Sequence, residues 1–226
     1  MQGALFAAGF VASMISTSAY AVLFVPVGLA PGDSYQLAFV TSATTNATSS
    51  DINSYNSFVQ AAADAAGIGS SEGVTWSAIA STSAINANSN AMVSTKVFNL
   101  GGQLLATGYA DFWDGSHTLG VGIDYTEYGV GKGANVWTGS NTDGTGAATN
   151  VLGNAVANWG ESASSSGNWI SRGTQSTTVN YSLYALSETL TVPVPEPETW
   201  AMLLAGLGLV GAAVRRRKGN KQKPER

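Results

Sequence analysis

Residues 179–192 read VNYSLYALSETLTV and form the longest segment of the chain with a strand pattern. Tyr181, Leu183 and Ala185 alternate with the side chains between them. Alternation predicts a β-strand, because successive side chains of a strand point to opposite faces of its sheet. We therefore expect this segment to be a central strand of the fold.

Outward from this strand, the sequence predicts one substantial helix, over residues 52–66. Asp51 or Ser54 can cap its start, and Gly67 is well placed to end it. Its apolar side chains recur at helical spacing, at Tyr55, Phe58, Val59, Ala62 and Ala66.

Short runs between glycine, asparagine and aspartate residues predict the other strands. We expect a long Gly/Ser/Thr/Asn loop over residues 139–176. One early helix followed by irregular, short antiparallel strands predicts an α+β domain. The expected strands are 22–27, 35–41, 75–80, 92–99, 103–107 and 136–138.

The composition excludes several classes of protein. There is no cysteine, which rules out a disulfide scaffold, a thiolate metal site and a cysteine nucleophile. A single histidine leaves no multi-histidine metal centre. Residues 22–194 hold eleven acidic and three basic residues (Lys96, Lys132 and Arg172), so this stretch repels phosphate backbones and a nucleic-acid function is excluded.

Residues 1–21 have the pattern of a signal peptide. They contain no charged side chain and end in Ala19-Tyr20-Ala21, a small-x-small sequence that signal peptidase cuts. We expect cleavage after Ala21 and an exported domain over residues 22–192.

Residues 193–226 combine Pro195-Glu196-Pro197, an uncharged stretch over 199–214 and the basic run Arg215-Arg216-Arg217. The stretch predicts a membrane helix, and the arginines keep their side of it in the cytoplasm. The three parts together resemble the PEP-CTERM sorting signal of Gram-negative bacteria. The resemblance implies an inner-membrane-anchored precursor, processing by exosortase, delivery to the cell surface or extracellular matrix, and a link to exopolysaccharide.

The body carries a second resemblance. It rests on the opening helix, VFNLGGQLLATGYADFWDG (97–115), VWTGSNTDG (136–144), a tryptophan about twenty residues further on, and LYALS (183–187). This order is similar to the endostatin-like branch of the C-type lectin fold and implies that fold over residues 51–192. The cysteines, and the histidines and arginines for zinc and heparin, are missing, so the resemblance implies none of those activities.

Three kinds of site can be drawn from the residues. His117, with Asp111 or Asp114 and a serine, would suit a hydrolase, but no Gly-x-Ser-x-Gly motif is present and we expect His117 in an exposed polar turn. A calcium site is the second candidate, because carboxylates on loops bind that ion; its residues would be Asp111, Asp114, Asp124 and Glu127.

The third candidate is a sugar-stacking platform of Trp159 and Trp169, which flank a polar loop, with core packing as the competing interpretation. Lys132 is expected to face solvent beside the acidic residues. We expect no catalytic activity, and calcium is the one candidate cofactor. The expected role is structural or binding, with a lectin-like module as the alternative.

Overall fold

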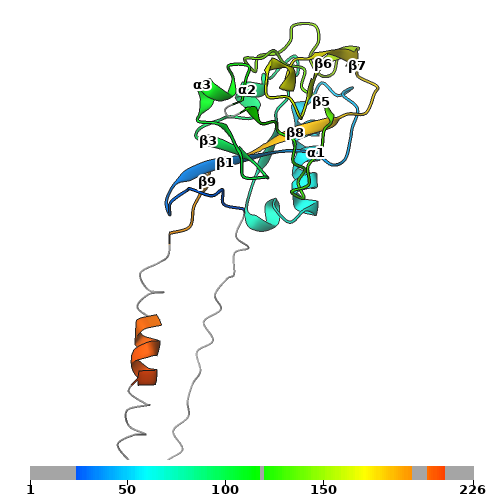
Figure 1. Ribbon diagram of the computed structural model, residues 1–226. Coiled ribbons are helices and arrows are strands. Elements are labelled where there is room, and N and C mark those ends of the chain that lie inside the picture. The colour runs from blue at the N-terminus through cyan, green and yellow to red at the C-terminus, as the bar shows by residue number, and fades with distance from the viewer. Residues whose placement is uncertain (1–23, 118–119, 195–202, 212–226) are drawn as a thin grey trace, which may run out of the picture.

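The computed structural model describes residues 24–117, 120–194 and 203–211 (Figure 1). It has the predicted α+β composition, with a large sheet and few helices. The helical elements are α1 (Ile52–Ala65), α2 (Ala87–Asn90) and α3 (Tyr109–Phe112), the 3-10 turns η1 (Ser70–Glu72) and η3 (Gly167–Trp169), and a helix over 203–211.

Nine strands of the described residues form one sheet. Its main path is β4-β3-β1-β8-β5-β6-β7, with β2 added to β8 and β9 added to β1. The strands are β1 (Ser34–Val40), β2 (Trp76–Ala78), β3 (Lys96–Asn99), β4 (Leu104–Ala106), β5 (Asn135–Trp137), β6 (Val156–Glu161), β7 (Gly173–Ser176), β8 (Ser182–Ser187) and β9 (Leu190–Thr191).

The predicted central strand is confirmed as β8. It pairs antiparallel with β1 and β2 and parallel with β5, and all six of its residues are buried. Leu183 and Ala185 face the core beneath α1, whereas Tyr184 and Leu186 face a second core on the other side of the sheet. The alternation therefore reflects two buried faces rather than one buried and one solvated face.

The predicted helix is also confirmed. Asp51 caps α1 by accepting a hydrogen bond from the Asn53 amide at 3.0 Å. Tyr55 and Val59 are buried against the sheet. The chain leaves the helix through Gly67, whose φ of 74° is the left-handed conformation that glycine adopts at little cost.

Side-chain amides cover the free edge of β2. Gln60 and Asn56 of α1 accept hydrogen bonds from the backbone amides of Trp76 and Ala78, at 2.8 and 2.9 Å. Asn90 of α2 donates to the Ala78 carbonyl at 2.7 Å. These bonds replace a neighbouring strand, so this edge is satisfied within the domain.

Three expectations about the strands are corrected. The sheet is mixed rather than antiparallel, because β1 pairs parallel with β3 and β5 pairs parallel with β8. The segment 139–176 is not one long loop, since it contains β6, β7 and η3. Residues 24–27, the described part of the expected first strand, are not in a strand. The strands β6 and β7 have no clear sequence pattern, because they are rich in small polar residues and their pairing depends on partners distant in sequence.

The two ends of the domain lie side by side at one pole (Figure 1). β9 pairs antiparallel with β1. The ladder ends with Gly32 donating to the Val192 carbonyl and Val192 donating to the Asp33 carbonyl, both at 2.9 Å. Pro193 has no amide hydrogen and cannot continue the ladder. The folded domain therefore ends where the prolines begin.

The predicted membrane helix extends beyond the described residues, because 199–202 and 212–214 lie outside them. Among the described residues, no helix is long and apolar enough to cross a membrane. The described part, 203–211, is helical and exposed along its length.

Candidate ligand-binding surface

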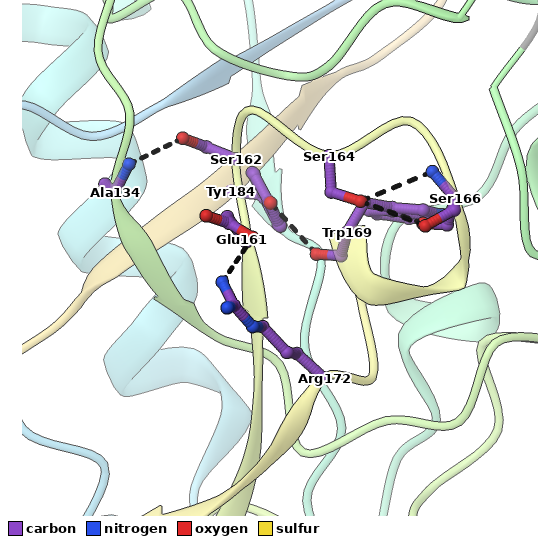
Figure 2. Close-up of polar contacts among 8 residues, drawn as sticks. All are labelled: Ala134, Glu161, Ser162, Ser164, Ser166, Trp169, Arg172 and Tyr184. Atoms are coloured by element: carbon purple, nitrogen blue, oxygen red, sulfur yellow. Dashed lines mark hydrogen bonds and ion pairs between the residues drawn. The ribbon is translucent and has the colours of Figure 1, made fainter.

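Trp169 is buried, which corrects its predicted role in an exposed platform. Its ring lies 5.2 Å from that of Phe112 and 5.8 Å from that of Tyr184, centroid to centroid. The Tyr184 hydroxyl donates to the Trp169 carbonyl at 2.9 Å (Figure 2). A Cβ atom at Gly160 would overlap that same carbonyl oxygen, so the loop can fold inward only because residue 160 is glycine.

Trp159 is half-buried and lies at the surface of the β6–β7 pair. Its indole packs beside Gly173, where a Cβ atom would lie 3.4 Å from Nε1. The Arg172 guanidinium lies 5.2 Å from the indole centroid and forms an ion pair with Glu161 (Figure 2). We call Trp159, Glu161 and Arg172 the hairpin surface. It joins an aromatic ring, a cation and a carboxylate, which together can contact the apolar face and the hydroxyl groups of a sugar.

The hairpin surface is supported from inside the domain. Tyr181 lies between Trp159 and the fully buried Trp137, at centroid distances of 5.9 and 4.7 Å. The Trp137 indole nitrogen donates to the Val179 carbonyl at 3.2 Å. These edge-on and tilted ring contacts hold Trp159 in place, so a ligand would meet a preformed surface.

The predicted calcium site does not form. No group of three or more His, Asp or Glu side chains among the described residues is arranged to hold a metal ion. Asp111 accepts hydrogen bonds from Thr107, and Asp114 accepts them from Ser116, each within its own turn. Short polar loops satisfy their carboxylates in this way, which is why closeness in sequence misled the prediction.

The other two candidate calcium ligands lie in different surroundings. Glu127 is buried and accepts a hydrogen bond from the Ser42 amide at 2.8 Å. Asp124 has a buried Oδ1 atom with no hydrogen-bond partner in the part of the chain that the structure describes, and burial raises the pKa of its carboxyl group. Neither side chain takes part in a shared oxygen cluster.

His117 is buried rather than exposed in a turn, which corrects the expectation. Its ring lies 4.6 Å from that of Trp169, and Nδ1 donates to the Val121 carbonyl at 3.0 Å. Burial lowers the pKa of His117 to about 4, against the smaller, opposing effects of the Val121 carbonyl, Asp114 and Asp111. Among the described residues Nε2 has no hydrogen-bond partner, and a pKa near 4 leaves the imidazole neutral at neutral pH.

Lys132 is half-buried, and its ammonium group is directed at backbone and hydroxyl oxygens rather than free in solvent. Its ammonium group donates to the Thr41 carbonyl, the Ser42 carbonyl and the Ser182 hydroxyl, each at 2.9 Å. Burial lowers its pKa, and the nearby Glu127 partly offsets this. Sequence patterns do not indicate this role, because two of the three acceptors are backbone carbonyls of a distant segment.

A polar hollow beside β2 is a second surface that sequence reasoning missed. It lies where β2 meets the end of β8, near the exposed Met92. Glu188 accepts a hydrogen bond from the Thr75 amide at 3.1 Å on its rim. The lining residues are Thr75, Ser77, Asn90, Ala91, Met92, Leu186, Ser187 and Glu188.

The predicted sorting and cleavage residues lie outside the described residues. These are Ala19, Ala21, Pro195, Glu196, Pro197, Arg215, Arg216 and Arg217. A comparison with protein families covers the six C-terminal residues of this set, whereas the cleavage site at Ala19 and Ala21 stays a prediction. Residues 193–218 match the PEP-CTERM protein-sorting motif.

The motif indicates an exported protein that exosortase processes and that is anchored in the membrane before processing. The match begins at Pro193, immediately after the last residue of the β1–β9 ladder. No curated protein matches the chain in sequence.

Proposed function

We propose that the chain is a cell-surface or extracellular-matrix protein whose body has a C-type-lectin-like fold and acts without catalysis, by binding or scaffolding exopolysaccharide. One observation carries the proposal: the PEP-CTERM motif begins where the folded domain ends. Removal of the anchor would then release a complete domain. The paired chain ends and the long connections between strands are consistent with the lectin-like fold.

The first experiment measures the intact mass and location of the protein in its native host. We expect a C-terminus within 195–199 and recovery in the surface or matrix fraction. Replacing Pro195, Glu196 and Pro197 together by alanine is expected to leave the chain ending at Arg226 in the inner membrane. Pro193→Ala, which lies outside the triplet, is the control. A wild-type protein that ends at Arg226 would contradict the proposal.

A carbohydrate-binding module is the second candidate, and the hairpin surface favours it. Trp159 is half-buried beside an exposed cation and carboxylate, whereas Trp169 is buried. We expect the processed protein to be retained on the host's own exopolysaccharide, and Trp159→Ala and Arg172→Gln each to weaken retention. Tyr128→Ala, at an exposed aromatic side chain elsewhere, is the matched control. Equal retention of all three variants would refute a role for this surface.

A hydrolase centred on His117 is the remaining alternative. It predicts that His117→Ala abolishes an activity of the processed protein. The neutral, buried imidazole does not favour this alternative, because a general base needs access to its substrate.

A further inference from the structure

The pole where both chain ends leave the domain is unusually apolar for a solvent-facing turn. The exposed residues of segments 27–34 and 193–194 include only one charged side chain, Asp33. Val27 is 98 % exposed and Val194 is 62 % exposed. We call the exposed apolar side chains of this pole the base patch; they are Val27, Ala30, Pro31, Pro193 and Val194.

We infer that the base patch rests on the phospholipid surface of the membrane that holds the precursor. This inference builds on the proposed anchored precursor. It adds an interaction surface of the folded body to the membrane segment itself. The occupant is the lipid headgroup region, which accepts exposed apolar side chains and a few cations.

The chain between the domain and the membrane segment is too short to let the base patch move far away. The ladder ends at Val192, and the predicted membrane segment begins at Thr199. The residues 193–198 span at most about 22 Å even when fully extended. Three of these residues are prolines, which favour a stiff, extended chain. The pole is therefore held over the bilayer.

Local packing fixes the base patch as a surface. Val25 and Leu29 pack against the core, which leaves Val27 between them at the tip of a turn. Gly28 follows with a φ of 93°, a conformation that suits this turn. A Cβ atom at Gly32 would lie 3.7 Å from the Val194 side chain, so the two segments of the patch touch.

The charges near the pole permit contact with lipid phosphates. Lys96 is exposed and pairs with Tyr35 at the base end of β1. Asp33 is the opposing charge, and its carboxylate accepts a hydrogen bond from the Ala30 amide at 2.8 Å. The other two basic residues of the body are engaged elsewhere, Lys132 within the fold and Arg172 with Glu161. The two charged side chains placed at the base, Lys96 and Asp33, therefore offset each other, whereas the body as a whole is acidic.

Contact at the base patch would place the Pro-Glu-Pro triplet in the narrow space between the domain and the bilayer. The protease would then have to approach from the side. Cleavage would free both the anchor and the patch, because a single domain held only by a few apolar side chains leaves a membrane readily.

The absence of cysteine from the chain permits a direct test. The chain from residue 22 to residue 226 is prepared as Val27→Cys, labelled with an environment-sensitive fluorophore, and inserted into vesicles of phosphatidylethanolamine and phosphatidylglycerol. Nitroxide-labelled lipid is the quencher. The matched control is Tyr128→Cys, which is 57 % exposed and lies near the other end of β1, because Val40 donates to the Tyr125 carbonyl.

We expect nitroxide lipid to lower the emission of the probe at residue 27 by about twofold, as for a side chain at the headgroup level, and to leave the probe at residue 128 unchanged. A chain that floats with the vesicles but shows equal, weak quenching at both positions would overturn the inference and leave the anchored precursor intact. A chain that fails to float with the vesicles would overturn both proposals.

Discussion

As the pH falls from about 6.5 to about 4, acid should weaken this protein chiefly through His117. Its pKa falls from an ordinary value of 6.5 to about 4 because the ring is buried against Trp169 and Phe112. Between these two pH values, His117 therefore binds a proton in the unfolded chain but not in the folded chain. Full development of this difference corresponds to about 3 kcal/mol of unfolding free energy, at 1.36 kcal/mol for each pKa unit.

The sign follows from the direction of the shift. Above about pH 6.5 the histidine is neutral in both states and the contribution to stability is fully present. As the pH falls toward about 4 the unfolded state gains protons first, so the free energy of unfolding declines. Asp64 and Asp143, whose pKa values are lowered by hydrogen bonds, act at lower pH. Asp124, whose pKa is raised by burial, opposes the loss.

The assay is urea denaturation of the processed protein, followed by tryptophan fluorescence between about pH 7.5 and pH 4.5. His117→Gln is the decisive variant, since an amide can still donate to the Val121 carbonyl but does not titrate. We expect the wild type to lose stability on acidification and the variant to start lower and stay nearly flat. A variant that loses as much stability as the wild type over this range would refute the assignment to His117.

Three further predictions concern stability and are read from thermal or urea unfolding. Gly160→Ala should lower the free energy of unfolding by more than about 3 kcal/mol, because its Cβ atom would overlap the Trp169 carbonyl. Gly131→Ala, with open space around it, should change that free energy by less than about 1 kcal/mol, and equal effects of the two variants would contradict the close approach. Lys132→Met should lower the free energy of unfolding by about 2–3 kcal/mol, because it leaves partly buried oxygen acceptors without a donor. An unchanged free energy would show that water replaces the ammonium group. Asn56→Ala should cost about 1–2 kcal/mol and speed hydrogen exchange at the edge of β2, and unchanged exchange would contradict the capping role.

The elements that were predictable are those whose signals are local. The helix α1 has an apolar stripe, a capping aspartate and a terminal glycine within one window of sequence. The central strand β8 has apolar side chains on both faces. By contrast, β6 and β7 contain glycine, asparagine and serine, and they form because each pairs with strands that sequence patterns do not reveal.

Of the two tryptophans predicted to form a surface platform, only Trp159 lies at the surface. Trp159 and Trp169 are both followed or preceded by small polar residues, and nothing in their neighbours separates an exposed ring from a buried one. The path of the chain determines which of the two rings is buried, because the missing side chain of Gly160 lets the loop close over Trp169. Arg172 and Glu161 are eleven positions apart and meet only through the pairing of β6 with β7.

The boundary between domain and sorting motif links the fold to the processing. The last ladder bond uses the amide and carbonyl of Val192, and the first residue beyond it is a proline that cannot extend the ladder. Cleavage anywhere from residue 195 onward would therefore leave every hydrogen bond between β1 and β9 in place. A motif that overlapped β9 would instead remove a strand from the sheet on processing. The observed order allows the anchor to be lost without cost to the stability of the body.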